Sequence, residues 1–433
     1  MIRIGMEFRD FGFSCLDFTS IEDGNPGCGG TQYEFALLAH HLIKSGFDCE
    51  IVFFHSNDNF FNPKIKDVKV KSLNDIPKAA NDYKIDILIF WPTHDQEWYD
   101  NLDQYCIKSI AWAHNFLTFK EIKWIKKCKN VIKVVCVGQE QYELLCGEDI
   151  FERCTFISNM FDFKIDGNLP LTNKKNSVCI LGSLIKAKGF HLLAKKWKHI
   201  VNKVPDCELF IIGGGNLWNN KVKLGKHGLA EQKYEDAFLK YLIDKNGEIL
   251  SSVHFLGNLG KEKEEIIKEC KVGVVNPNGI ETFCLSAIEM EALGVPVCSK
   301  KKNGLINSVR NKKTGLLSKT TNGLSRNIIK LLKSDEYSKT LGINGIEYAK
   351  QFAGDILIKE WALLLSSVHA GSNFKKSVSI HFFTRMKFIR YFIHLLRKVI
   401  ILRFIPTPFQ INSFYLAIKS KLAKIKNRVL TSN

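Results

Sequence analysis

Short apolar runs alternate with amphipathic helical segments along most of the chain. The runs that predict strands are Met1–Glu7, Ile85–Trp91, Ile107–Trp112, Val134–Val137, Cys154–Ile157, Val178–Leu181, Leu209–Ile212 and Val253–Gly257. Helical periodicity marks Tyr33–Ser45 and Phe190–Val201 between them. Short buried-looking strands that alternate with helices predict an α/β protein with doubly wound parallel sheets.

A polar, turn-rich segment divides this pattern. We predict a linker over 166–177, a first domain over 1–165 and a second over 178–348, followed by a crossover helix over 349–369 and a tail over 370–433. With 433 residues, of which 45% are hydrophobic, the chain is long and apolar enough for two cores of ordinary domain size.

The region around residue 280 carries the strongest candidate chemistry. Turn-forming residues 276–279 precede an amphipathic helical pattern that places Glu281 at the helix start and Glu289 about two turns later. The free N–H groups from Thr282 to Leu285 would suit a diphosphate, and Glu289 would suit a ribose diol. The alternative is that both glutamates are ordinary solvated helix residues.

A second candidate segment follows the strand at 178–181. Gly182 and Ser183 end that strand, Lys188 follows before the next helix, and the strand at 209–212 ends in Gly213 and Gly214. Glycine at such strand ends lets phosphate approach the backbone, and Lys188 would offset a leaving diphosphate. A lysine before glycine is otherwise an ordinary solvated turn residue.

In this order the segments resemble the GT-B fold glycosyltransferases of the large retaining family 4 group, also called glycosyl transferases group 1. The similar stretches run from Gly182 through the helix start at 281–289 to the strand at 314–317. The resemblance implies two Rossmann-like domains facing across a cleft, an anomer-retaining reaction and a nucleoside diphosphate sugar donor.

The resemblance also implies roles for individual residues. Lys188 would neutralise the diphosphate, Glu281 would hold the donor sugar, and Glu289 would bind the ribose. The amides of Phe283, Cys284 and Leu285 would meet the phosphates, beside Thr282. Two positions depart from the family pattern: Ser183 stands where arginine is common, and Cys284, where glycine is common, would put a side chain near the donor.

The first half fits the same plan with weaker signals. Gly29, Gly30 and Thr31 precede a helix, and the resemblance implies that they face the donor phosphates; a flexible loop with an ordinary helix cap is the alternative. His114 follows a predicted strand and resembles the family histidine that contacts the donated sugar, although a purely structural histidine fits the sequence equally.

Cysteines and metal-binding patterns add little further chemistry. The 13 cysteines are scattered and never spaced as Cys-x-x-Cys, which favours reduced thiols and a cytoplasmic setting. The N-terminus lacks a basic-then-apolar leader, so we expect no signal peptide. No Asp-x-Asp pair is present, so we expect no metal and no other cofactor, with the nucleotide sugar as co-substrate.

Positive charge is concentrated in the tail. Residues 370–433 hold 13 Lys and Arg and no Asp or Glu, so they carry +13 of the formal net charge of +18. Bulky apolar residues alternate with these cations over 380–405, without a run of about 20 apolar residues that a spanning helix needs. We predict a helix lying on an anionic membrane surface; a helix packed on the second domain is the alternative, and nucleic acid is disfavoured.

Together the site and the tail predict an enzyme at the inner face of the plasma membrane. It would move a hexose or related sugar onto a lipid-linked or growing glycan acceptor in surface polysaccharide or lipopolysaccharide assembly. Two other readings remain open, because one fold supports many functions. One is a sugar phosphorylase or epimerase with this fold, and the other is a non-catalytic homologue that binds nucleotide sugar or lipid.

Overall fold

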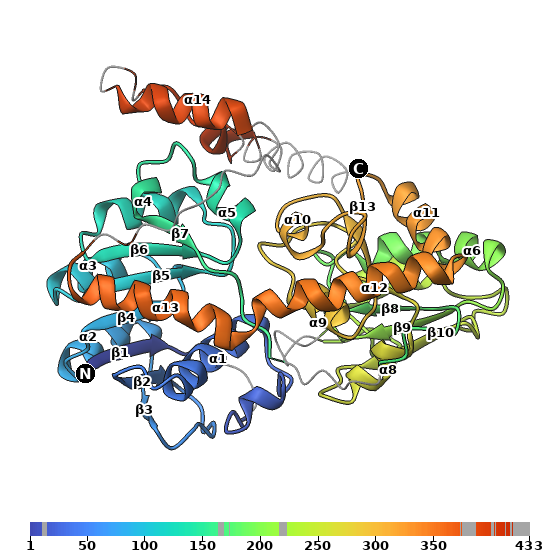
Figure 1. The fold of residues 1–433 in the computed structure, drawn as a ribbon, viewed down its shortest axis with the longest axis horizontal. Coiled ribbons are helices and arrows are strands. Elements are labelled where there is room, and N and C mark those ends of the chain that lie inside the picture. Colours follow the sequence, from blue (N-terminus) through green and yellow to red (C-terminus); the bar gives the residue numbers. More distant parts are fainter. Residues whose placement is uncertain are drawn as a thin grey trace, which may run out of the picture.

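The computed structural model describes residues 1–10, 15–162, 169–172, 174–215, 223–372, 374, 387–399, 402, 404–411, 413–415 and 418. Within these residues the chain forms two α/β units that lie side by side, each built around a parallel sheet (Figure 1). The predicted fold class is therefore confirmed. Part of the predicted linker, residues 166–168 and 173, and most of the tail lie outside the described residues.

The first unit contains seven parallel strands in the order β3-β2-β1-β4-β5-β6-β7. Its strands are β1 Ile2–Glu7, β2 Cys49–His55, β3 Ile65–Lys69, β4 Ile87–Phe90, β5 Ser109–Ala113, β6 Val131–Cys136 and β7 Cys154–Phe156. Its helices are α1 Gly30–Lys44, α2 Ile76–Asp82, α3 Gln96–Gln104, α4 Phe119–Lys127 and α5 Gln139–Leu144, with 3-10 turns at Ile21–Asp23, Leu73–Asp75 and Phe151–Arg153. The central strands β4 and β5 are buried throughout, because helices cover both faces of the sheet.

The second unit contains six parallel strands in the order β10-β9-β8-β11-β12-β13. Its strands are β8 Ser177–Leu181, β9 Glu208–Ile212, β10 Val253–Gly257, β11 Val272–Val274, β12 Val297–Lys300 and β13 Gly315–Ser318. Its helices are α6 Phe190–Lys203, α7 Gln232–Leu239, α8 Lys263–Glu269, α9 Leu285–Ala292, α10 Leu305–Ser308 and α11 Thr321–Leu332.

Both sheets reverse their strand order once, and this reversal decides where a ligand can bind. The reversal lies between β1 and β4 in the first unit and between β8 and β11 in the second. At such a point the loops after neighbouring strands leave in opposite directions and open a crevice at the carboxyl ends of the strands. Each unit therefore offers one crevice, after Glu7 and Phe90 in the first and after Leu181 and Val274 in the second.

Two long helices connect the units at the end of the described fold. Helix α12 Asp335–Ala349 packs on α9, and after the 3-10 turn Lys350–Phe352, helix α13 Gly354–His369 returns to pack on α1 (Figure 1). Trp361 of α13 meets Trp112 of β5 with ring centroids 4.7 Å apart. Phe283 and Ile288 of the second unit belong to the same buried cluster as α1 and α13, so the units share an apolar core.

The C-terminal helix α14 Lys387–Lys398 lies over the first unit, beyond α4 and α5 (Figure 1). Arg397 is paired with Asp149 at 2.9 Å, and Gln410 donates to Glu148 at 3.2 Å. The alternative prediction, a tail helix packed on the second domain, is therefore wrong for this helix. No helix among the described ranges is both long and apolar enough to cross a bilayer.

Candidate active site between the two units

The loop that carries Glu281 ends in a shorter helix than the sequence predicts. Helix α9 begins at Leu285 with Cys284 as its N-cap residue, so the prediction of a helix starting at Glu281 is wrong. The reason is a long-range contact: Gly304, which follows α9 in the sequence, donates its N–H to the Glu281 carbonyl at 2.8 Å and keeps residues 281–284 in an irregular loop. Glu289 consequently lies about one turn into α9.

Lys188 and Glu281 form an ion pair at the crevice of the second unit. Asn276 also donates its side-chain N–H to Glu281 Oε1 at 2.8 Å, so the carboxylate is fixed from two sides. Burial disfavours the Lys188 ammonium, but the charge of Glu281 outweighs this and raises the pKa of the lysine. Two residues predicted from separate segments are therefore in direct contact, and Lys188 stays charged.

Glycines make the close approach of these loops possible. Gly189 has φ +80°, and a Cβ there would lie 2.6 Å from the Asn278 nitrogen. Gly213 has φ +135°, and a Cβ there would lie 2.2 Å from the Gly182 carbonyl oxygen. Leu184 donates its N–H to the Gly214 carbonyl at 3.0 Å, so the four predicted glycine-loop positions 182, 183, 213 and 214 form one packed layer beneath the crevice.

Cys284 and Ser183, two of the predicted donor-binding residues, are buried in the protein interior. The Cys284 amide donates to Ser308 Oγ at 2.9 Å, and its side chain is only 4% exposed. The Cys284 amide therefore already has a partner within the protein and is not free for a phosphate in this arrangement, whereas its buried thiol lies within electrostatic range of Lys188 and Glu281. Burial also raises the pKa of the Cys284 thiol, and Ser183 is likewise buried.

Glu289 is paired with a lysine that the sequence analysis did not single out. Lys263, at the start of α8, lies 2.5 Å from Glu289 Oε1, and the two side chains are 11% and 15% exposed. Burial opposes the Lys263 ammonium, but Glu289 outweighs burial and raises its pKa. Lys263 lies in a charged stretch, Lys261–Glu265, that resembles a solvated helix start, so no sequence signal marked it.

The glycine loop and His114 of the first unit lie against the crevice of the second unit. Gly29 caps α1, and a Cβ on Gly30 would lie 3.4 Å from the Leu285 side chain. Thr282 donates its hydroxyl to the His114 carbonyl at 2.6 Å, and Phe283 is buried in the shared core. Residues predicted in the two halves of the chain are thus brought together.

The imidazole ring of His114 is buried and uncharged. It is 7% exposed, its Nε2 has no hydrogen-bond partner within the described part of the chain, and burial lowers its pKa to about 3. The ring packs against Trp112 with centroids 4.5 Å apart. At neutral pH His114 is therefore an uncharged donor or acceptor.

The crevice of the first unit is nearly filled by side chains and leaves no space for a water molecule. It is lined by Glu7, Arg9, Thr31, Gln32, Phe35 and Trp91. Arg9 pairs with Glu7 at 2.5 Å, while the Trp91 amide donates to the other Glu7 oxygen at 2.8 Å. Of these residues only Thr31 is predicted from the sequence as a site residue, because a lone Arg or Glu after a strand carries no distinctive spacing.

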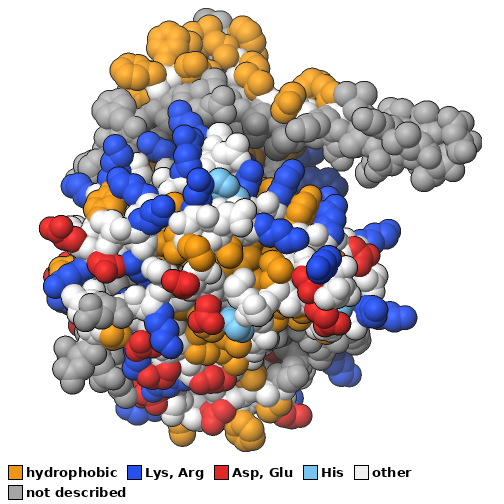
Figure 2. Space-filling model, turned by 90° about the vertical axis from the view of Figure 1, so that its right-hand side faces the viewer, with side chains coloured by type: hydrophobic (Ala, Val, Ile, Leu, Met, Phe, Trp, Pro, Cys, Tyr) orange, Lys and Arg blue, Asp and Glu red, His pale blue; other side chains and the backbone are white. Residues whose placement is uncertain are grey.

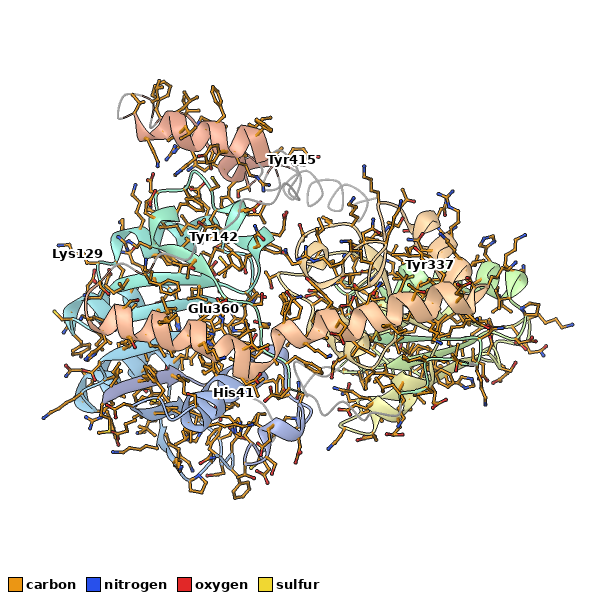
Figure 3. All side chains as sticks on the ribbon, viewed as in Figure 1. His41, Lys129, Tyr142, Tyr337, Glu360 and Tyr415 are labelled. Carbon is orange, nitrogen blue, oxygen red and sulfur yellow. The ribbon has the colours of Figure 1, made fainter. Side chains whose placement is uncertain are left out.

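A histidine contact fixes the place where the chain leaves the first unit. His41 of α1, labelled in Figure 3, lies with its Nε2 2.5 Å from Asp162 Oδ2, and Asp162 also accepts from the Gly354 amide at 3.2 Å. The start of α13 is thereby tied to α1. Among the described residues, no group of three or more His, Cys, Asp or Glu is placed to hold a metal ion.

A comparison with protein families finds a match in the second half of the chain. The model of the family "Glycosyl transferases group 1" matches residues 162–348, the part of the chain that contains Lys188, Glu281 and Glu289. An uncharacterized glycosyltransferase of Methanocaldococcus jannaschii is 27% identical over 227 residues, covering 52% of this chain and 56% of that protein. The capsular polysaccharide biosynthesis glycosyltransferase CapM of Staphylococcus aureus is 25% identical over 207 residues, covering 46% of this chain and 49% of CapM. The chain thus spans about half the length of these curated relatives.

Solved structures share the whole two-unit architecture. Sucrose-phosphate synthase from Thermosynechococcus elongatus superposes with a TM-score of 0.65 at 16% identity, covering 86% of this chain and 100% of that one. HepE of Anabaena in complex with UDP-glucose gives a TM-score of 0.61 at 15% identity, covering 85% and 100%. The chain has the GT-B fold, and residues 162–348 of it match the family model of glycosyl transferases group 1.

Proposed function

We propose that this protein is a glycosyltransferase that uses a nucleoside diphosphate sugar. The observation that carries the proposal is the Lys188–Glu281 ion pair, fixed in the crevice of the second unit beside the start of α9 and the backbone of His114. A charged lysine beside free helix amides suits a departing diphosphate, and a fixed carboxylate suits sugar hydroxyls.

The proposed chemistry assigns a role to each wall of the site. Lys188 neutralises the diphosphate as the bond to the anomeric carbon breaks, while Glu281 and His114 hold the donated sugar and Glu289 holds the ribose. Gly29, Gly30, Thr31 and the amides of Phe283 and Leu285 complete the phosphate contacts. We propose retention at the anomeric carbon and no metal requirement, since Lys188 supplies the positive charge.

The names of the relatives support an acceptor in glycan assembly. CapM is named for capsular polysaccharide biosynthesis, and a relative from Campylobacter jejuni, 27% identical over 216 residues, is named as an N-acetylgalactosaminyltransferase acting on a diphospho-undecaprenol-linked sugar. We propose a lipid-linked or growing glycan acceptor, in surface polysaccharide or lipopolysaccharide assembly. The surface of the first unit around Arg9 and Thr31 is the proposed acceptor side.

Helix α14 supports a location at the cytoplasmic face of the membrane. Its basic side chains Arg390 and Arg397 face the first unit, whereas Phe388 and Phe392 are 79% and 60% exposed. Figure 2 shows hydrophobic side chains gathered at this end of the molecule and Lys and Arg side chains on the surface beneath them. Apolar residues that enter a bilayer beside a cationic surface are the features of an interfacial helix.

A nucleotide-release assay tests the enzymatic proposal. Purified protein is incubated with UDP, GDP and other nucleoside diphosphate sugars, with and without membrane extract, and the released nucleotide and glycosylated lipid are measured. We expect release that depends on one donor and on the extract. Sugar 1-phosphate formed from a glycan and inorganic phosphate, without nucleotide release, would indicate a phosphorylase. A changed sugar still bound to its nucleotide would indicate an epimerase, and nucleotide-sugar binding without turnover would indicate a non-catalytic homologue.

A vesicle-binding assay tests the membrane proposal. Deleting residues from 372 onward, and separately the pair Phe388→Ser and Phe392→Ser, should reduce binding to anionic vesicles. Leu363→Ser on α13, where the leucine is 66% exposed, is the matched control. Unchanged binding of both α14 variants would refute this role of the tail.

A further inference from the structure

Charge is distributed unevenly within the second unit. Residues 231–292 hold 7 Lys and 12 Asp or Glu, whereas residues 293–334 hold 10 Lys or Arg and no Asp or Glu. The acid-free stretch contains β12, α10, β13 and α11. One continuous part of the second unit is therefore strongly cationic, while the part before it in the sequence is acidic.

The lysines of this stretch surround β13, which is an edge strand of the second sheet. Lys301 and Lys319 lie at its carboxyl end, where the Lys301 amide donates to the Ser318 carbonyl at 2.8 Å. Lys313 lies at the other end, two residues before β13 begins. We call the five exposed lysines around this strand the β13-edge lysines: Lys301, Lys302, Lys312, Lys313 and Lys319.

The charge of the β13-edge lysines is not neutralised within the protein. None of the five is paired with a carboxylate of the described residues. Beside them, burial and the charge of Lys302 lower the pKa of Lys300. Like charges held close together on one surface repel each other, and an anionic partner would relieve this repulsion.

Protection of a free sheet edge explains only part of this charge. Lysine beside an edge strand hinders pairing with other chains. The exposed positions of α11, however, include Arg326, Lys330 and Lys333 and no acidic residue, although a helix has no free edge to protect. The cationic surface thus extends beyond the strand, which indicates a broad anionic partner.

The β13 edge lies on the same side of the molecule as α14. Figure 1 shows β13 and α10 on the upper side of the second unit, while α14 lies above the first unit. Figure 2, which views the molecule from the end of the second unit, shows Lys and Arg side chains gathered in the upper half, below the hydrophobic side chains at the top. A flat surface that takes up the exposed Phe388 and Phe392 of α14 therefore also faces the β13 edge.

We propose that the β13 edge of the second unit is a second membrane-contact surface, which binds the anionic lipid headgroups of a bilayer. The inference rests on the proposed location at the membrane, and it adds the second unit to the contact that α14 makes from the first. With contacts on both units, the crevice between them lies over the bilayer, where a lipid-linked acceptor is held.

Flotation of the full-length protein with vesicles of phosphatidylcholine, with and without phosphatidylglycerol, tests this proposal. The variant carries Lys301→Gln, Lys313→Gln and Lys319→Gln together, and none of these residues belongs to the proposed donor site. We expect it to bind anionic vesicles roughly 10- to 100-fold more weakly than wild type, because each lysine near an anionic surface contributes roughly 5-fold. Binding to pure phosphatidylcholine vesicles should not change.

A matched variant removes the same charge elsewhere on the second unit. It carries Lys226→Gln, Lys233→Gln and Lys245→Gln, three exposed lysines that lie between β9 and β10 in the sequence, and β10 is the opposite edge strand of the sheet. This control should bind anionic vesicles like wild type. Equal losses in both triple variants would show that only net charge matters and would overturn the inference. Equal melting temperatures for wild type and both variants show that each is folded.

Salt and the α14 variant separate the two contacts. Raising the NaCl concentration from about 0.1 M to about 1 M shortens the Debye length from about 10 Å to about 3 Å, so the difference between wild type and the β13-edge variant should shrink. Weaker binding by Phe388→Ser with Phe392→Ser, but not by the β13-edge variant, would overturn this inference and leave the proposed location standing. Weaker binding of the β13-edge variant to a single-stranded oligonucleotide, with vesicle binding unchanged, would also overturn it. Failure of wild type to bind any vesicle would overturn both.

Discussion

The two walls of the interdomain site differ in charge. The second unit supplies ion-paired groups, Lys188 with Glu281 and Lys263 with Glu289. The first unit supplies buried polar groups whose reactive atoms have no partner among the described residues, His114 Nε2, Tyr33 Oη and Gln32 Oε1. Apart from the Arg9–Glu7 pair in its own crevice, the first unit therefore offers a donor neutral groups, the Gly29–Thr31 loop for the phosphates and polar side chains for hydroxyls and carbonyls, while the second unit supplies the charged side chains.

The largest expected effect comes from the charged wall. Lys188→Ala and Glu281→Ala should each lower turnover by roughly 10²- to 10³-fold or more, because each removes a preorganised contact to the reacting donor. Initial rates of nucleotide release measure this, with circular dichroism to show that both variants fold. Lys195→Ala, an exposed lysine on α6, is the control. Normal turnover in either site variant would refute the assigned roles.

A smaller loss of turnover is expected when His114, in the first unit, is replaced. His114→Ala should lower turnover by roughly 10-fold or more, since one hydrogen bond to a donated sugar contributes about 1 to 2 kcal/mol. His114→Gln, which keeps a polar group without a titrating ring, should retain more activity than His114→Ala. Equal rates for wild type and His114→Ala would make His114 a structural residue only.

The burial of His114 also predicts a pH dependence of stability. Its pKa is lowered to about 3 in the folded protein from an ordinary 6.5, so below pH 6.5 the unfolded chain binds a proton that the folded protein does not. The buried neutral ring of His114 therefore contributes fully to the free energy of unfolding above pH 6.5, and this contribution is lost as the pH falls toward 3. Melting temperatures at pH 7.5, 6.0 and 4.5 should fall more steeply for wild type than for His114→Gln; parallel curves would show that the ring is not buried as described.

Loss of the hydrogen bond from Thr282 to His114, which joins the second unit to the first, should give the smallest effect. Thr282→Val removes the hydroxyl that donates to the His114 carbonyl at 2.6 Å. We expect a loss of about 1 kcal/mol in the free energy of unfolding and a severalfold increase in the donor KM, because the walls are held together less firmly. Chemical denaturation and steady-state kinetics measure both quantities. A lower turnover number with an unchanged KM would place Thr282 in the reaction rather than in the junction.

The sequence predicted the fold and the charged residues Lys188, Glu281 and Glu289. It did not predict Lys263, which pairs with Glu289. Short apolar runs ending in glycine located β8 and β9, and the segments carrying Lys188 and Glu281 meet as the order of motifs implied. The start of α9 was misplaced because the 2.8 Å bond from Gly304 to the Glu281 carbonyl is a long-range contact that local periodicity does not encode.

The partners in the site were missed for a similar reason. Lys263, Tyr33 and Arg9 have ordinary local sequence surroundings, and only the packing of one unit against the other gives them a position in the site. The tail shows the same limit. Its composition predicted an amphipathic helix, but the pairing of Arg397 with Asp149 depends on a surface far away in the sequence.

A crystal structure of the protein with its preferred nucleoside diphosphate tests the central claim most directly. We expect the diphosphate between Lys188 and the first turn of α9 and the ribose on Glu289. A nucleotide bound elsewhere with this crevice empty, at a concentration that saturates binding in solution, would contradict it.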